Sequence, residues 1–160
     1  MLHITIMAVG KLKERYLAEG TAEYLKRLKP YARVDVVEVP DEPFAENAGA
    51  AEREKVKETE GEKIIRRLRP GTFLIVLDAA GESPSSERMA ARLGELALAG
   101  RSDITLAVGG ALGHSRAVLS RAGMLLSFSR FTFPHQLMRL ILLEQVYRWF
   151  RISRGEPYHN

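Results

Sequence analysis

The sequence predicts an α/β domain in which a parallel β-sheet is flanked by helices on both faces. Three observations lead to this prediction. Short apolar runs alternate with longer amphipathic segments along the chain. One run, TFLIVL, is continuously apolar and bounded by turn residues, which is typical of parallel strands buried on both faces, and DITLAV reads as another buried strand. A chain of 160 residues is long enough for one core, so we expect a single domain over residues 1–160.

The first part of the chain predicts two strands and two helices. Leu2–Val9 alternates apolar and polar residues and ends at a glycine, which indicates a strand. Lys13–Leu28 gathers its tyrosines and leucines on one helical face and stops before a proline. Val34–Val39 predicts the second strand. After a loop rich in proline and acidic residues, Ala50–Leu68 predicts a highly charged helix with few apolar anchors.

The middle of the chain predicts the two central strands. They are Thr72–Leu77, the continuously apolar run, and Asp103–Val108, which reads as another buried strand. Between them, Asp78–Pro84 reads as a loop and Ser85–Ala99 as a helix that closes at a glycine, a common C-cap.

The last part of the chain predicts a short helix over Ser115–Ala122, a fifth strand over Met124–Phe128 and a long helix over Phe133–Ile152. Ser115 is a suitable N-cap for the short helix. Pro134 falls in the first turn of the long helix, where its missing N–H costs nothing. The buried side of this helix is predicted to carry Leu137, Leu140, Ile141, Val146, Tyr147 and Phe150.

The C-terminal part of the chain is basic. Residues 115–160 contain seven arginines, two glutamates, and no lysine or aspartate, whereas the whole chain has a formal net charge of only +4. This asymmetry is typical of a surface that meets an anionic partner, although a solvated basic helix would give the same pattern. Because the guanidinium group binds oxyanions with two parallel hydrogen bonds, the use of arginine alone favours phosphate contacts.

Three strand ends are expected to meet in one ligand pocket. Leu77 ends the third strand, the Gly109-Gly110 pair ends the fourth, and residues 127–132 follow the fifth. In an open parallel sheet, ligands bind beyond the carboxyl ends of the strands. A pair of glycines permits close approach of the backbone to a ligand, although a plain tight turn would also explain it.

Common motifs for other chemistries are absent or weak. The sequence has no P-loop, and the spacing of GGALG differs from the dinucleotide fingerprint. Ser115 within GHSRA is a poor match to the nucleophile elbow of hydrolases, and a helix cap explains this serine fully. The four histidines are not closely paired, so nothing requires a metal. There is no cysteine and no apolar run near eighteen residues; we expect a cytoplasmic protein without a membrane span.

The last helix and the tail hold the remaining polar candidates. His135 and Arg139 are four residues apart and share a helical face, and His135 sits in the first turn beside the pocket loops. Glu144 and Arg148 repeat this spacing, for which we prefer an ordinary ion pair. The tail RGEPYH consists of residues with special conformations or polar groups, which predicts that it is docked near a site.

Several segments closely resemble one family. VGG (108–110), LSFSRFTFPHQLMRLILLEQVYR (126–148), RGEPYHN (154–160) and the N-terminal LHITIMAVGKLKERYLAEGTAEYLKRL are similar to the bacterial ribosomal RNA pseudouridine-N3 methyltransferases of the SPOUT class, the RlmH family. The resemblance covers nearly the whole chain. It implies a homodimer, a C-terminal trefoil knot that no topology rule predicts, and S-adenosylmethionine bound in the knot. It assigns the cofactor to Leu77, Gly109, Phe128, Ser129, Arg130, Phe131, Thr132 and Phe133.

The resemblance also implies the substrate, a pseudouridine in a stem-loop of 23S ribosomal RNA on the large subunit or the assembled ribosome. Loss of the N3 proton makes this ring nucleophilic, so a base or a nearby cation should help. We expect His135, Arg139, Tyr158 and His159 to surround it, with Arg139 stabilising the anion and His159, or less favourably His135, accepting the proton.

RNA contacts complete the expectations. Arg148, Arg151 and Arg154 are expected to contact phosphate, and Trp149, Phe150 and Tyr158 are candidates for stacking on bases, although Phe150 is favoured as a core residue. The competing interpretation is a non-catalytic module of the same fold that binds RNA or the ribosome. The pocket loops and the terminal Tyr-His pair argue against it, because a module without chemistry needs neither.

Overall fold

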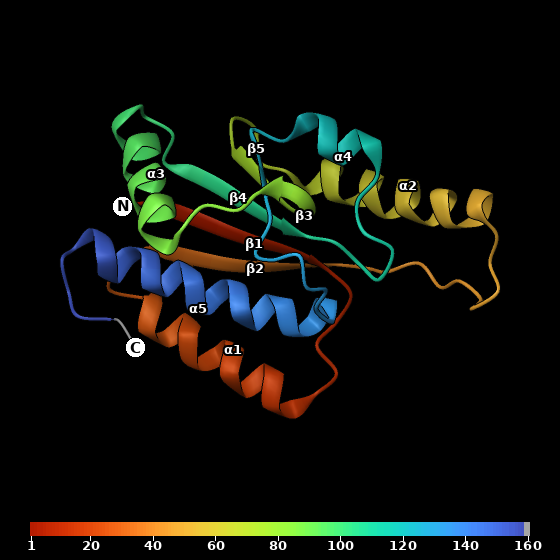
Figure 1. Ribbon diagram of the computed structural model, residues 1–160, viewed down its shortest axis with the longest axis horizontal. Helices are drawn as coiled ribbons and strands as arrows, with labels where there is room; N and C mark the ends of the chain where they lie inside the picture. The colour runs from red at the N-terminus through yellow and green to blue at the C-terminus, as the bar shows by residue number, and fades with distance from the viewer. Residues whose placement is uncertain (159–160) are drawn as a thin grey trace.

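The computed structural model describes residues 1–158 and contains a five-stranded sheet (Figure 1). The strand order is β2-β1-β4-β3-β5, and every neighbouring pair is parallel, which confirms the predicted sheet. The bounds of the strands are β1 His3–Val9, β2 Arg33–Val39, β3 Phe73–Glu82, β4 Asp103–Val108 and β5 Met124–Leu126. β4 lies at the centre between β1 and β3, and both β1 and β4 are buried along nearly their whole length.

Helices cover both faces, as predicted (Figure 1). One face carries α1 (Arg15–Leu28), α3 (Ser86–Leu98) and α5 (His135–Ser153). The other carries α2 (Ala50–Arg67) and the short α4 (Arg116–Arg121). No helix in residues 1–158 is long and apolar enough to cross a membrane.

The two cores follow from the period-two geometry of the strands. Ile4 and Ile6 of β1 point to the side of α1, α3 and α5, while Met7 and Val9 point to the side of α2 and α4. The larger core contains Leu142, Leu143, Val146 and Trp149 of α5, so the last helix is anchored along most of its length.

The predicted loop over Asp78–Pro84 is wrong, because β3 continues to Glu82. Its register against β5 shifts, with both Leu77 and Glu82 opposite Leu126, so the strand bulges and then pairs again. The backbone N–H of Ser127 donates to the Glu82 carbonyl at 2.7 Å. Residues such as Ala79 and Gly81 have little strand propensity of their own, so pairing with β5 decides this part of the strand.

Two predictions about the last helix are corrected. Pro134 is the N-cap residue, with φ −55° and ψ 133°, and His135 is the first helical residue. Of the six residues predicted on the buried side, Val146 is fully buried and the others are half-buried; Arg139, Leu142, Leu143 and Trp149 are buried instead. The helix packs against the sheet and is flanked by α1 and α3, so its half-buried residues lie at both edges (Figure 1).

Candidate active site

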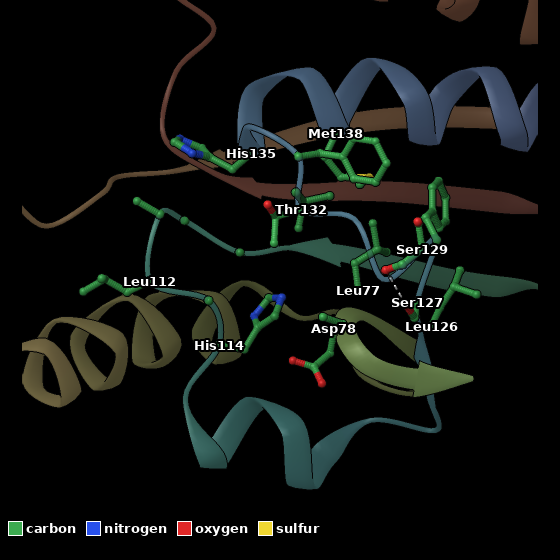
Figure 2. A pocket seen from close by; sticks show the side chains of 18 of the residues that line it. Leu77, Asp78, Leu112, His114, Leu126, Ser127, Ser129, Thr132, His135 and Met138 are labelled. Atoms are coloured by element: carbon green, nitrogen blue, oxygen red, sulfur yellow. Dashed lines mark hydrogen bonds between the residues drawn. The ribbon is translucent and has the colours of Figure 1, made fainter. Parts of the chain in front are cut away.

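The three strand ends line one cavity of about 420 Å³ at the carboxyl edge of the sheet (Figure 2). Leu77 and Asp78 come from β3, residues 108–114 from the end of β4 and the turn after it, and residues 126–129 and 131–133 from the end of β5 and the segment after it. The start of α5 closes the cavity with His135 and Met138. This convergence was predicted from the positions of the three loops at the carboxyl ends of parallel strands, and it places the cavity where open parallel sheets bind ligands.

The glycine turn after β4 is tightly packed at Gly109. A Cβ on Gly109 would lie 3.2 Å from Nε2 of His114 and 3.2 Å from the carbonyl carbon of Gly113. Gly113 has φ +88°, a left-handed conformation that favours glycine. The turn therefore presents its backbone directly to the cavity.

The segment after β5 is held by its own serines. Ser127 donates its hydroxyl to the Ser129 carbonyl at 3.2 Å, and the Ser129 hydroxyl accepts from the N–H of Phe131 at 3.0 Å (Figure 2). Every residue predicted to bind the cofactor lines the cavity except Arg130, which is exposed and outside the lining: the lining holds Leu77, Gly109, Phe128, Ser129, Phe131, Thr132 and Phe133.

His114 is a lining residue that the sequence reasoning did not select. The residue is 7% exposed, and neither ring nitrogen has a hydrogen-bond partner among the described residues. Burial lowers its pKa to about 4, against the opposite influence of Asp78 and the carbonyls of Ala107 and Leu77. A neutral imidazole thus faces the cavity at neutral pH, and the only signal of this in the sequence is the glycine turn that directly precedes it.

His135 lies at the mouth of the cavity, half-buried at the first turn of α5. Burial lowers its pKa, the positive charges of Arg139 and Lys13 lower it further, and Asp41 opposes them. His135 is therefore neutral near pH 7 and able to accept a proton. Its Nε2 lies 3.9 Å from the position that a Cβ on Gly10 would take, so the ring packs against the end of β1.

Arg139 is buried beneath the surface and is not exposed to a space where a target ring could bind. It is 1% exposed, and its Nη1 donates to Oε2 of Glu38 at 2.7 Å. Its Nη2 donates to the carbonyl of Gly10 at 2.9 Å. These bonds tie α5 to the ends of β1 and β2, beside His135.

The described part of the tail is docked, but away from the cavity of its own chain. The ring of Tyr158 lies over the Arg148 guanidinium at 4.6 Å, and its hydroxyl donates to Glu144 at 3.4 Å. Glu144 follows His135 by about 13 Å along α5 at 1.5 Å per residue. Burial raises the pKa of Tyr158 to about 12, with the hydrogen bond to Tyr24 and the charge of Glu144 adding to it, so it stays protonated. His159 lies outside the described residues.

The three arginines expected to bind RNA make contacts within the chain. Arg148 forms the predicted ion pair with Glu144, at 2.5 Å. Arg151 pairs with Glu156 and donates to the Pro157 carbonyl. Arg154 is exposed and stacks over Tyr31 at 4.3 Å.

The structure also bears on the candidates for base stacking and on Ser115 as a nucleophile. Trp149, a candidate for stacking on bases, is 2% exposed and belongs to the core. Phe150 packs against the same core, as favoured. Ser115 is 2% exposed and accepts the N–H of Val118 as the cap of α4, so it is no exposed nucleophile. Within residues 1–158, no cluster of histidine and acidic side chains has the spacing of a metal site.

Comparisons with known proteins agree with this arrangement. The family model described as "Predicted SPOUT methyltransferase" matches residues 2–159. Two relatives, both called Ribosomal RNA large subunit methyltransferase H, come from Pelotomaculum thermopropionicum and Desulforamulus reducens. The first is 68% identical and covers 99% of each chain; the second is 57% identical and covers 100% of each.

Two solved structures share the fold at low identity. A probable rRNA-methyltransferase from Porphyromonas gingivalis has a TM-score of 0.55 at 14% identity and covers 95% of this chain and 69% of that one. A probable methylase family protein from Haemophilus influenzae has a TM-score of 0.54 at 10% identity and covers 98% and 70%. Together with the whole-length relatives, these matches show that the chain belongs to the SPOUT methyltransferase family.

Proposed function

We propose that this chain transfers a methyl group from S-adenosylmethionine to N3 of a pseudouridine in a stem-loop of 23S ribosomal RNA. The observation that carries the proposal is the cavity at the sheet edge, which is lined by the segments that the family resemblance assigns to the cofactor. Relatives named for methylation of large-subunit ribosomal RNA support the choice of substrate.

The cavity fits a nucleoside-type cofactor. Its volume lies within the roughly 300–1,000 Å³ typical of small-molecule sites. Leu77, Leu126 and Met138 offer apolar walls, and the glycine turn offers backbone groups that no Cβ shields. The two nitrogens of His114 add an uncharged donor and an acceptor. S-adenosylmethionine, when bound, supplies a methyl group activated by a positive sulfur.

The residues of the chain would then orient the target and take its proton. His135 is neutral at the cavity mouth, so its imidazole is a candidate acceptor for the N3 proton. Arg139 holds α5 against β1 and so fixes where His135 stands. Arg139 lies four residues from His135 on the same helix. Its positive charge is the basis of its proposed role as a cation near the target ring. His159 remains the first choice as base, on the resemblance alone.

A second copy of the chain would complete each site. Tyr158 remains protonated and can orient the target ring by donating its hydroxyl, but it stands far from the cavity of its own chain. If it takes part in the reaction, it must do so in the cavity of a partner. The exposed aromatic rings of Phe131 and Phe133 at the rim of the cavity support burial against another chain. We therefore propose a homodimer.

The basic tail would contact RNA on the ribosome. Arg154 is exposed, and its stack on Tyr31 leaves further donors available for phosphate. Arg148 and Arg151 are already paired with glutamates, so we propose weaker phosphate contacts for them. Binding should weaken as salt rises.

Transfer of labelled methyl groups tests the proposal. The purified protein is incubated with labelled S-adenosylmethionine and ribosomes, large subunits or free 23S RNA from cells lacking the gene, and the product is mapped by mass spectrometry. We expect a methyl group on N3 of one pseudouridine. Calorimetry with S-adenosylmethionine separates the enzyme from a non-catalytic binding module, because the module would give no heat of binding.

His159→Ala tests the proposed base. We expect the His159→Ala variant to transfer methyl groups more slowly than the wild type throughout the neutral pH range. Transfer at the normal rate across neutral pH would reject the assignment of His159 as the base and leave His135 as the candidate.

A further inference from the structure

A buried carboxylate lies directly behind the glycine turn of the donor cavity. Glu60 of α2 is 4% exposed. A Cβ on Gly110 would stand 3.0 Å from its Oε1 and 3.4 Å from its Oε2, so the carboxylate packs on the backbone of the turn. Neither the comparison with relatives nor the strand-end argument points to α2, which is on the opposite face of the sheet from α5 (Figure 1).

The two oxygens of this carboxylate are used differently. Oε2 accepts the backbone N–H of Glu42 at 2.9 Å. Oε1 is buried and has no hydrogen-bond partner among the described residues. Meanwhile the N–H groups of Ala111 and Leu112, in the adjoining turn, donate to no acceptor in residues 1–158. The unpaired acceptor thus packs on Gly110, the residue that directly precedes these two N–H groups in the chain.

The neighbouring glycine fixes how α2 fits beneath the loop. A Cβ on Gly61 would come within 2.2 Å of the Ser115 hydroxyl oxygen, which caps α4. Glu60 and Gly61 therefore meet the two ends of the loop from Gly110 to Ser115. This close packing fixes the position of the Glu60 carboxylate against the turn.

Burying this carboxylate is costly. Burial raises the pKa of Glu60, and the negative charges of Asp41 and Glu42 raise it further, while the Glu42 N–H and Lys63 lower it. An apolar side chain of similar size would avoid that cost. A charged group retained at such a cost beside a ligand cavity is a candidate for a role in binding.

We propose that Glu60 is a positioning residue for the methyl donor. When the donor occupies the cavity, Oε1 accepts an N–H of the turn at Ala111 or Leu112 and holds the turn in its binding conformation. This inference rests on the proposed function, because it assumes that S-adenosylmethionine is the ligand of the cavity. It adds a residue on α2 to a site otherwise built from strand ends and α5.

Glu60→Gln is the sharpest variant, because it keeps size and shape. The amide can still accept the Glu42 N–H with its oxygen, and it then presents its NH₂ group to the N–H groups of the turn. We expect the dissociation constant for S-adenosylmethionine, measured by calorimetry, to rise by about tenfold or more. We expect the melting temperature not to fall, since a neutral amide costs less to bury than a carboxylate.

Glu58→Gln is the matched control. It makes the same change on the same helix at an exposed residue that forms no hydrogen bond or ion pair in the described chain. It should bind the donor as the wild type does. Amide hydrogen exchange gives a second measurement: the N–H groups of Ala111 and Leu112 should become protected when the donor binds to the wild type, but not when it binds to Glu60→Gln.

The outcomes separate the two proposals. If the wild type does not bind S-adenosylmethionine, the proposed function itself fails. If the wild type binds and Glu60→Gln binds equally well, the inference about Glu60 is overturned. A Glu60→Gln protein that melts well below the wild type while keeping its affinity overturns it too, because Glu60 is then merely structural. Should the variant not fold, unchanged exchange at Ala111 and Leu112 in the donor-bound wild type would overturn the inference.

Discussion

At the scale of single residues, burial decides the charge of His114. The unfolded chain binds a proton at this imidazole near the ordinary pKa of 6.5, whereas the folded chain does so only near 4. As pH falls through this interval the unfolded state takes up a proton that the native state refuses, so stability falls. Above pH 6.5 this contribution is fully present.

We expect the free energy of unfolding to fall by about 3 kcal/mol between pH 7 and pH 4 because of this group. His114→Leu removes the group and should flatten the dependence on pH. Urea unfolding of both proteins across this range measures the difference. Equal slopes for the two proteins would contradict the assignment, and a nitrogen chemical shift of a charged imidazole at pH 6 would contradict it independently.

A second prediction at this scale concerns Arg139. Arg139→Gln would leave Glu38 without its partner and the Gly10 carbonyl without its donor, at a site that is 1% exposed. Removing one member of a buried pair costs about 3 kcal/mol or more, reduced here because Glu38 is partly exposed. Arg148→Gln, which breaks a more exposed pair within one helix, should cost below about 1 kcal/mol. Urea midpoints compare the two. Equal losses would show that Arg139 is not a structural anchor.

At the scale of elements, the pairing of β3 with β5 positions the segment from Ser127 to Phe133. Gly81 sits in the bulge, where a Cβ would lie 2.6 Å from the backbone of Leu125. Its φ does not require glycine, so close packing of two strands is the reason for this residue.

We expect Gly81→Ala to push β5 away, to destabilise the protein by about 2 kcal/mol and to weaken binding of S-adenosylmethionine. Gly94→Ala is the control. Gly94 lies in α3 with no atom within 4 Å of an added Cβ, so alanine should stabilise by about 0.5–1 kcal/mol. Thermal unfolding and calorimetry measure both effects. If the Gly81→Ala protein bound S-adenosylmethionine with unchanged affinity, the bulge would not be needed to position the binding segment.

At the scale of the whole molecule, the distance between tail and cavity predicts complementation between chains. Gly109→Val should obstruct the cavity of the chain that carries it, because a Cβ added at this position would lie 3.2 Å from Nε2 of His114, which lines the cavity. Tyr158→Ala removes a ring from the tail. Each protein alone should transfer little methyl, but a mixture that exchanges subunits should recover about a quarter of the wild-type activity, since half of the dimers then contain one intact site.

Sedimentation should show that the wild type and both variants are dimers. A mixture with no recovered activity, although heterodimers form, would mean that each site is built from one chain. Recovery without a dimer would contradict the proposed assembly in the same way.

Much of the site was visible in the sequence because it follows from local patterns. The apolar runs of β3 and β4 and the glycines after β4 indicate where strands end, and parallel strands end at one edge. The burial of Arg139 and Glu60 was not visible. Both are charged residues on helices, and a charged helical residue is ordinarily expected to face solvent. Arg139 is buried because it packs against the end of β1, and Glu60 because it packs against the glycine turn.

The sequence by itself determined the order of strands and helices along the chain, the parallel sheet and the edge at which the cavity lies, because periodicity and turn residues act over a few neighbouring positions. Tertiary structure alone decided the extension of β3, the neutral state of His114 and the burial of Trp149. These depend on segments far apart in the chain, whose contacts remove water from a side chain or supply a strand to pair with.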